Sequence, residues 1–316
     1  MGRGRRDSGG DAELVAVVDL GSTAVRFLLA RVIPEVGYRI LVEERVPTRL
    51  GSGRHGTLPR DAIDETLRAV HRFFSRYSWN GSGPRVVAVA TSAVRDAGNR
   101  ERLLAPLRRD EGIEVQVLSA REEARLGVEA ALDSLSVRDG VVVDLGGASL
   151  QLSRVRDRRI VSYASFPLGA VRVTARFLRR DPPSLADLRT LRSEIRARLA
   201  AGLPPGERGE VMVGMGGTIR ALATMYLRAH PGERKHRHGL RMLQSDVTAI
   251  RERLEGLGRR RRRKIRGLKA ERADIILGGA IVVEETMIFG GYLSLLVCTR
   301  GVRDGILLHE TFSGRG

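Results

Sequence analysis

Residues 140–152 read GVVVDLGGASLQL, and the rest of the chain is organised around this stretch. An apolar run ends in Asp144, a turn of glycines and small residues follows, and alternating apolar residues lead away from it. The pattern predicts a strand, a tight turn and a second strand, with one carboxylate at the mouth of the turn. A near copy, LVAVVDLGST, occupies residues 14–23 and places Asp19 in the corresponding position. Two such units in one chain indicate a duplicated structural device.

The two turns have the chemistry of an anion-binding site. Glycine and serine residues let backbone N–H groups point inward without obstruction from Cβ atoms, and such a nest of N–H groups binds anionic oxygens. An aspartate at the entrance would repel a bare phosphate but accept one that carries a hydrated magnesium ion. Two such turns that face each other would therefore hold a phosphate chain.

A third glycine turn lies further along the chain. Residues 211–222 read VMVGMGGTIRAL, which predicts a strand, a turn and a helix with Thr218 at its start. Because a helix N-terminus attracts anions, this element also suits phosphate. The sequence contains no GxxxxGK[ST] motif, which excludes a P-loop. The strands expected after the first two turns argue against a dinucleotide-binding GxGxxG turn, which opens a helix.

The composition is that of a globular protein. With 316 residues, 42% of them hydrophobic, the chain is long enough to bury a full core and to form two domains. The lone cysteine, Cys298, excludes an internal disulfide framework. There is no apolar stretch of membrane-spanning length and no signal-peptide core, so we expect a cytoplasmic protein with no membrane partner. Residues 1–11 read as a disordered basic tail.

The formal net charge of +18 predicts attraction to polyanions that weakens as salt rises. Part of this excess can reflect a general preference for arginine on solvated faces. The basic run from Arg259 to Lys264 has two interpretations, a nucleic-acid patch or an exposed linker. Because no aromatic residues are interleaved with it, we favour the linker and expect no specific nucleic-acid binding.

A short buried strand is expected at residues 86–90, and it runs into Thr91, Ser92 and Arg95. Hydroxyl groups and an arginine at the carboxyl end of a strand suit a phosphate ligand. The alternative is that Thr91 or Ser92 caps a helix and that Arg95 is only solvated. This segment alone favours neither interpretation.

Two adjacent glutamates have different expected roles. Ser119 and Glu122 form the S-x-x-E pattern of a capping box, so Glu122 should reach back to the backbone N–H of Ser119. Glu123 has no such local duty. A nearby carboxylate such as Asp144 would raise the pKa of Glu123 and make it a better proton acceptor near neutral pH. The alternative is a solvated glutamate at a helix start, and the local sequence leaves both open.

Taken together, the motifs resemble those of the exopolyphosphatase and guanosine pentaphosphate phosphatase (Ppx/GppA) family, within the actin-like ATPase superfamily. The resemblance runs from about Val15 to Leu308. In chain order the motifs are Asp19-Leu20-Gly21-Ser22, Ala90-Thr91-Ser92-Ala93-Val94-Arg95, residues 118–126 (LSAREEARL), Asp144-Leu145-Gly146-Gly147, Pro167-Leu168-Gly169-Ala170-Val171-Arg172, Gly214-Met215-Gly216-Gly217-Thr218 and Arg272-Ala273-Asp274-Ile275-Ile276. Each is weak alone, but seven in order are specific.

The resemblance implies an α/β fold of the two-domain actin-like (ribonuclease H-like) ATPase class. Its mixed sheets would be flanked by helices, and the active site would lie in the interdomain cleft. Domain I would span residues 12–135, with a C-terminal helix at about 301–312 returning to it, and domain II would span residues 136–300. Dimerisation through the second domain is also plausible by resemblance.

The same resemblance implies release of terminal orthophosphate from inorganic polyphosphate, dependent on Mg²⁺ or, as an alternative, Mn²⁺. By family position Glu123 would activate the attacking water and Asp144 would hold the metal. The implied phosphate-binding residues are Asp19, Gly21, Ser22, Thr23, Arg95, Gly146, Gly147, Ala148, Ser149, Gly216, Gly217 and Thr218.

Among the residues that depart from the family pattern, two motivate an alternative function. Ala148 stands where a third glycine is usual, and Gln151 stands where the family has a glutamate, so a second carboxylate is missing from the metal site. A catalytically weak polyphosphate-binding or nucleotide-binding regulatory protein is therefore one alternative. Hydrolysis of guanosine pentaphosphate is the other, and the sequence does not separate it from polyphosphate hydrolysis.

Overall fold

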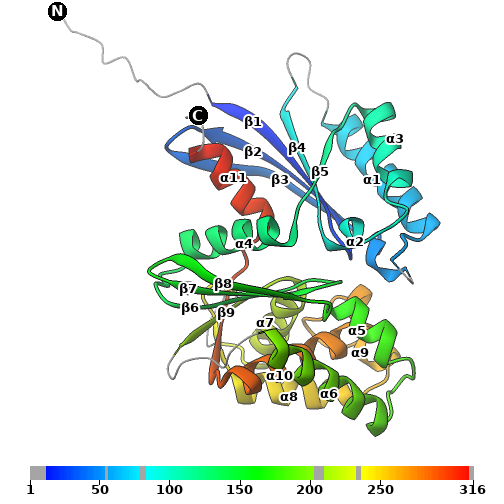
Figure 1. Ribbon diagram of the computed structural model, residues 1–316, viewed down its shortest axis with the longest axis vertical. Helices are drawn as coiled ribbons and strands as arrows, with labels where there is room; N and C mark the ends of the chain where they lie inside the picture. The colour runs from blue at the N-terminus through cyan, green and yellow to red at the C-terminus, as the bar shows by residue number, and fades with distance from the viewer. Residues whose placement is uncertain (1–11, 54–55, 78–82, 203–209, 233–235, 313–316) are drawn as a thin grey trace, which may run out of the picture.

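The computed structural model describes residues 12–53, 56–77, 83–202, 210–232 and 236–312. The tail expected at residues 1–11 lies outside these ranges. Figure 1 shows two halves, each built on a sheet with helices against it. Both sheets contain parallel and antiparallel strand pairs.

The first sheet has the strand order β3-β2-β1-β4-β5. Its strands are β1 (Glu13–Leu20), β2 (Val25–Ile33), β3 (Gly37–Val46), β4 (Arg85–Ala90) and β5 (Val115–Val117). The segments that accompany it are η1 (Leu50–Ser52), α1 (Arg60–Arg76), α2 (Ser92–Arg95), α3 (Glu101–Glu111), α4 (Ala120–Ser134) and α11 (Val302–Phe312).

Strand β1 is apolar from Leu14 to Val18 because both of its faces are covered. Ala16 and Val18 join a core with residues of α1 and α3, whereas Val15 and Val17 join a core with residues of α4 and α11. Successive side chains of a strand point to opposite faces, so this alternation places a helical layer on each side of the sheet. Helix α11, the last helix of the chain, thus packs on the first sheet (Figure 1).

The second sheet has the strand order β10-β11-β9-β6-β7-β8. Its strands are β6 (Gly140–Leu145), β7 (Leu150–Arg156), β8 (Arg159–Phe166), β9 (Val211–Met215), β10 (Arg241–Leu243) and β11 (Ser294–Val297). The segments that accompany it are α5 (Ala170–Phe177), α6 (Leu185–Gly202), α7 (Gly217–Ala229), α8 (Gln244–Glu255), α9 (Arg259–Arg262), η2 (Ala270–Arg272) and α10 (Ile276–Gly290).

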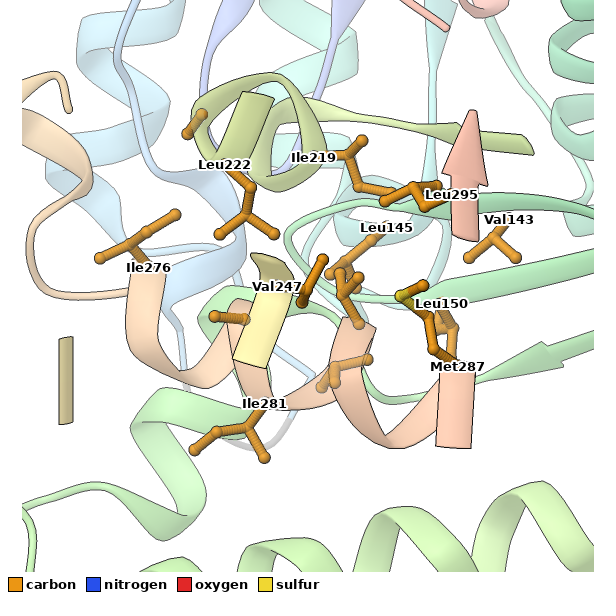
Figure 2. Close-up of a cluster of buried hydrophobic side chains, with 14 of the residues drawn as sticks. Val143, Leu145, Leu150, Ile219, Leu222, Val247, Ile276, Ile281, Met287 and Leu295 are labelled. Carbon is orange, nitrogen blue, oxygen red and sulfur yellow. The ribbon is translucent and has the colours of Figure 1, made fainter. Parts of the chain in front are cut away.

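The largest core of the protein lies on one face of the second sheet. Figure 2 shows Val143, Leu145 and Leu150 of the central hairpin packed with side chains of α7, α8 and α10, among them Leu222 and Ile281. The other face of this sheet packs against α4. Because α4 also contributes Leu126 to the core of the first sheet, it lies between the two sheets.

The duplicated device predicted from the sequence is present in both halves. Strands β1 and β2 form an antiparallel pair around the first turn, and β6 and β7 form the same pair around the second. In each sheet the first strand of the hairpin also has a parallel partner, β4 or β9. The aspartates at the ends of β1 and β6 therefore occupy equivalent places.

The run at residues 259–264 is exposed except at Arg262, as expected of a linker, but it is ordered and begins with a short helix. Residues Arg259–Arg262 form the short helix α9, whose first N–H donates to both carboxylate oxygens of Asp181 at 2.8 Å. Arg262 is only 3% exposed, and its Nε donates to the carbonyl oxygen of Leu254 at 2.9 Å. The buried arginine ties α9 to the end of α8, which is why the run is ordered.

Every helix in the described part of the chain is either too short or too polar to span a bilayer.

Candidate active site

A pocket of about 100 Å³ lies where the two halves meet. Strands β1 and β4 run parallel, so their carboxyl ends lie at the same edge of the first sheet. Strands β6 and β9 also run parallel, and their carboxyl ends lie at the same edge of the second sheet. Asp19, Thr91, Asp144 and Met215, at or directly after these strand ends, all line the pocket, and Glu123 reaches it from α4. Ligands of open α/β sheets bind at such edges.

The first two glycine turns approach each other closely. A Cβ atom on Gly147 would lie 2.9 Å from Cβ of Ser22 and 3.0 Å from Cγ2 of Thr23, which is closer than side chains tolerate. Ser22 also lies next to the end of β4, because its Oγ is 3.3 Å from Oγ of Ser92. The turns thus form two opposed walls of one pocket, with hydroxyl groups between them.

The third turn fits only because it contains glycine. Gly216 has φ of 98°, a conformation that residues with a Cβ atom rarely adopt, and a Cβ there would lie 2.3 Å from the carbonyl oxygen of Leu145. Helix α7 starts directly after it, with Thr218 in its first turn. The N–H groups of this helix start add a third anion-binding element to the wall of the pocket.

Glu122 caps the helix, as the sequence predicts, and its neighbour Glu123 lines the pocket. Ser119 and Glu122 form the capping box, with the backbone N–H of Ser119 donating to Oε2 of Glu122 at 2.8 Å. Glu123 is 9% exposed, and Nη1 of Arg95 donates to its Oε2 at 3.0 Å. Burial and the nearby Asp144 raise the pKa of Glu123 to about 7, against the opposing effect of Arg95. A carboxylate with this pKa can accept a proton near neutral pH.

Arg95 does not have the solvated role that was one alternative. Besides Glu123, it donates to the carbonyl oxygen of Leu118 at 2.9 Å, so it joins α2 to the segment before α4. Thr91 is the residue before α2, but its side chain accepts no hydrogen bond from that helix.

The two aspartates of the duplicated hairpins, Asp19 and Asp144, have different cross-strand neighbours. Arg26 is the cross-strand partner of Asp19 and donates to it at 2.9 Å. Gln151 is the cross-strand partner of Asp144 and is 3% exposed. Neither polar atom of the Gln151 side chain has a hydrogen-bond partner among the described residues. The second hairpin therefore places a neutral, unpartnered amide where the first places a cation.

The surroundings of Asp144 disfavour the charged form of its carboxylate. Burial raises its pKa, while Arg220 and Arg26 oppose that rise. Within the described ranges, no donor makes a hydrogen bond to its carboxylate. A partly buried carboxylate without donors is costly unless a cation or a proton compensates it.

The residues present fit a magnesium ion that binds together with phosphate. Asp144 and Asp19 both line the pocket, and Mg²⁺ typically takes one or two carboxylates, several waters and substrate phosphate oxygens. The described residues contain no group of three or more His, Cys, Asp or Glu side chains that could hold a metal ion by themselves. The site is thus suited to a metal shared with the ligand rather than to an all-protein cage.

Sequence reasoning missed the cations of the pocket. The described pocket wall includes five arginines: Arg26, Arg220, Arg272, Arg300 and Arg303. Two signals could have found some of them. Arg26 lies opposite Asp19 once the hairpin register is drawn, and Arg220 follows the third glycine turn within the first turn of its helix. Arg272 begins the last of the seven motifs, but its role depends on how η2 packs.

Most of the residues predicted for the site meet in this pocket. Those that line it are Asp19, Gly21, Ser22, Thr23, Glu123, Asp144, Gly146, Gly147, Gly216, Gly217 and Thr218. Arg95, Ala148 and Ser149 are not among its lining residues. Ala148 is 3% exposed, and its carbonyl oxygen accepts from the N–H of Gly169 at 3.1 Å, so it supports the turn from behind.

This arrangement agrees with the comparisons to known proteins. The sequence model of the Ppx/GppA phosphatase family matches residues 31–313. The chain belongs to the Ppx/GppA phosphatase family. Exopolyphosphatase 2 of Mycobacterium tuberculosis is 32% identical over 314 residues, which cover 93% of this chain and 97% of that relative. Exopolyphosphatase 1 of the same species is 28% identical, with 94% of this chain and 88% of the relative covered.

Solved structures of Ppx/GppA proteins have the same fold. The Aquifex aeolicus member of the family is 27% identical, with a TM-score of 0.77 over 95% of this chain and 98% of that one. An exopolyphosphatase from Cytophaga hutchinsonii is 22% identical, with a TM-score of 0.82 over 95% and 98%. The predicted fold class, an actin-like ATPase fold of mixed sheets flanked by helices, is confirmed, and so is the prediction of a hydrolase. The domain boundaries at 135 and 300 and the roles of individual site residues stay predictions.

Proposed function

We propose that this Ppx/GppA protein is an exopolyphosphatase that releases terminal orthophosphate from inorganic polyphosphate. The observation that carries the proposal is that Glu123, with a pKa of about 7, shares one pocket with Asp144, the glycine turns and several arginines. Such a pocket offers a proton acceptor, oxygen ligands for a metal and donors for phosphate oxygens at one place.

In the proposed reaction a water oxygen forms a bond to the terminal phosphorus, and the bond from that phosphorus to the bridging oxygen breaks. Glu123 accepts the proton of the water. The electron pair of the broken bond stays on the bridging oxygen, so the shortened chain leaves as an anion. Other N–H groups of the first two glycine turns, and those at the start of α7, would bind the equatorial oxygens as charge builds up on them; the N–H groups of Gly21 and Gly146 close their turns by donating to the carbonyl oxygens of Ala24 and Ser149.

Mg²⁺, or Mn²⁺ as an alternative, belongs to the proposal as cofactor. Asp144 would hold it together with phosphate oxygens, and the bound cation would neutralise charge on the transferring group. Asp19 would act as a metal ligand only if its ion pair with Arg26, at 2.9 Å, were broken. A homodimer formed through the second half and a cytoplasmic location remain part of the proposal, as expectations from the sequence.

The test is phosphate release from long-chain polyphosphate by the parent and by Glu123→Gln, with Mg²⁺ and with the metal chelated. We expect the variant to lose about a hundredfold or more in kcat, because general base catalysis typically contributes that much. Glu122→Gln is the matched control, since this neighbouring carboxylate serves the capping box. Equal release by the parent and Glu123→Gln would show that Glu123 is not the base.

Two other results would replace the proposal. Faster turnover of guanosine pentaphosphate than of polyphosphate by the same preparation would make the protein a nucleotide phosphatase. Polyphosphate binding without any metal-dependent release would support the regulatory alternative, to which the neutral Gln151 beside Asp144 points.

A further inference from the structure

One histidine lies between the two places where the chain passes from one half of the molecule to the other. The chain enters the second sheet through residues 135–139, between α4 and β6, and leaves it through residues 298–301, between β11 and α11. Nε2 of His238 lies 3.0 Å from the carbonyl oxygen of Ser134, the last residue of α4. Its Nδ1 lies 3.3 Å from both the backbone N and Oγ1 of Thr299. A single side chain thus joins the two connections.

The partners of His238 determine which nitrogen of its ring carries the hydrogen. The carbonyl oxygen of Ser134 can only accept, so Nε2 donates to it. The backbone N–H of Thr299 can only donate, so Nδ1 accepts. Because Ser134 ends α4, its carbonyl oxygen has no partner within the helix. The neutral imidazole therefore satisfies one group of each connection.

The backbone that follows His238 is fixed to the end of β11. The N–H of Gly239 donates to the carbonyl oxygen of Val297 at 2.9 Å, and the N–H of Val297 donates to the carbonyl oxygen of Leu240 at 2.8 Å. Gly239 has φ of 73°, in the left-handed region that favours glycine, so the chain can turn directly after the histidine. The ring therefore approaches Thr299 from a segment that is itself bound to the strand before Thr299.

Thr299 links this histidine to the candidate active site. Its carbonyl oxygen accepts from Nη1 of Arg220 at 3.1 Å, and among the described residues this is the only side-chain hydrogen bond of Arg220. Arg220 lines the active-site pocket. Burial and neighbouring arginines lower its pKa to about 10, against the opposing effect of Asp144. Since other cations repel the guanidinium, its position depends on the one carbonyl group that accepts from it.

We propose that His238 is a positioning residue of the active site, which fixes Thr299 between the two connections and thereby keeps Arg220 directed at substrate phosphate. His238 itself is not among the residues that line the active-site pocket, so it acts only through Thr299. The inference rests on the proposed function, because it takes phosphate as the ligand of Arg220.

The test compares three substitutions of His238 in the full-length protein. His238→Phe keeps a ring but makes neither hydrogen bond. His238→Asn keeps an acceptor close to the place of Nδ1, next to Thr299, and His238→Gln keeps a donor close to the place of Nε2, next to Ser134. The matched control is His236→Phe, because this exposed histidine lies two residues earlier and outside the active-site pocket.

The measurements are KM and kcat for phosphate release from polyphosphate, with melting temperatures of all variants. We expect His238→Phe to raise KM about tenfold with little change in kcat, because Arg220 would contact phosphate in the ground state and in the transition state alike. His238→Asn, which can still accept from Thr299, should restore most of the affinity, whereas His238→Gln should not. His236→Phe should match the parent. An unchanged KM in His238→Phe, or equal KM values for His238→Asn and His238→Gln, would overturn the inference.

A double-substitution cycle tests whether the effect passes through Arg220. Binding of tripolyphosphate to the Glu123→Gln protein is measured with His238→Phe, with Arg220→Ala and with both. We expect the two together to weaken binding no more than Arg220→Ala alone, because the contact that His238 supports is then already lost. Additive losses would show that His238 does not act through Arg220. His238→Gln takes the place of His238→Phe in the cycle if the latter does not fold.

The two proposals fail in different ways. If the parent shows no Glu123-dependent phosphate release, the proposed function falls, and the cycle in tripolyphosphate affinity still decides the role of His238. If the parent does release phosphate but the losses in the cycle are additive, only the positioning role of His238 is wrong.

Discussion

The pKa of Glu123 results from opposing neighbours at the end of its side chain. Burial raises it, Asp144 and Asp19 raise it further, and the hydrogen bond from Arg95 lowers it. Since a general base must be deprotonated, kcat/KM should increase as pH rises through about 7. The pKa of this carboxylate near neutral pH thus depends on residues from three other elements, β1, α2 and β6.

Replacing Arg95 with methionine should move this pH dependence. Loss of the guanidinium removes the main group that lowers the pKa of Glu123, so the acidic limb of kcat/KM should shift to higher pH. The measurement is a pH–rate profile of parent and variant, with circular dichroism to check folding, because Arg95 also bonds to the carbonyl of Leu118. If the acidic limb of kcat/KM stayed at the same pH in the variant, a group other than Glu123 would determine that limb.

Gln151 offers a second test at the scale of one residue. It is buried opposite Asp144, and both polar atoms of its amide lack partners among the described residues. Gln151→Glu would add a carboxylate there, so Mg²⁺ should bind about tenfold more tightly in calorimetry without substrate. Gln151→Met, which keeps the volume and adds no charge, should leave the affinity near that of the parent. Equal affinities in all three proteins would show that position 151 does not face the metal.

At the scale of elements, the start of α4 is where local sequence and site geometry meet. The capping box of Ser119 and Glu122 satisfies N–H groups at the helix start and leaves the next residue, Glu123, pointing into the pocket. The helix then passes between the two sheets, with Leu126 and Val128 in different cores. A frayed first turn would therefore misplace Glu123, the proposed base, without unfolding the helix.

Ser119→Ala should consequently reduce both stability and turnover. Loss of an N-cap side chain typically costs about 1 kcal/mol, which should lower the melting temperature by a few degrees. We also expect a lower kcat with little change in KM, because Glu123 loses its fixed position while the phosphate-binding turns stay in place. Glu122→Gln, which keeps the capping-box pattern, should have a smaller effect on both. A lower melting temperature with an unchanged kcat would show that the N-cap stabilises the protein but does not position Glu123.

The element-level prediction that differs from the structure concerns a run of charged side chains, one of which is buried. The capping box, the hairpins and the three glycine turns follow from local rules, and all are present. The run at 259–264 is composed like a linker, yet Arg262 is buried against the end of α8. Composition cannot reveal such a contact, since an arginine buries its apolar stem only where a neighbour covers it.

For the whole molecule, the net charge of +18 and the arginines of the active-site pocket predict that binding of a polyanionic substrate depends strongly on ionic strength. KM for long-chain polyphosphate should rise steeply between about 50 and 200 mM salt, because binding of a polyanion releases counterions that salt restores. Steady-state kinetics at several salt concentrations, with magnesium held in excess, measure this directly. A KM that stays flat across this range would mean that the charge excess plays no part in substrate capture.

By itself, the sequence determined the family, the fold class, the duplicated hairpins and the identity of Glu123 as the glutamate left over by the capping box. These depend on periodicity, turn chemistry and spacing, which are local properties of the chain. Only the tertiary structure brought Arg26, Arg220 and Arg272 together, because they lie on elements nearly 250 residues apart at the extremes and meet only when the two halves close on the same pocket. It also showed that Arg95 serves Glu123 and that Gln151 lies buried beside Asp144. The crowding and the desolvation of charged groups arise from tertiary packing, so no local sequence pattern could have predicted them.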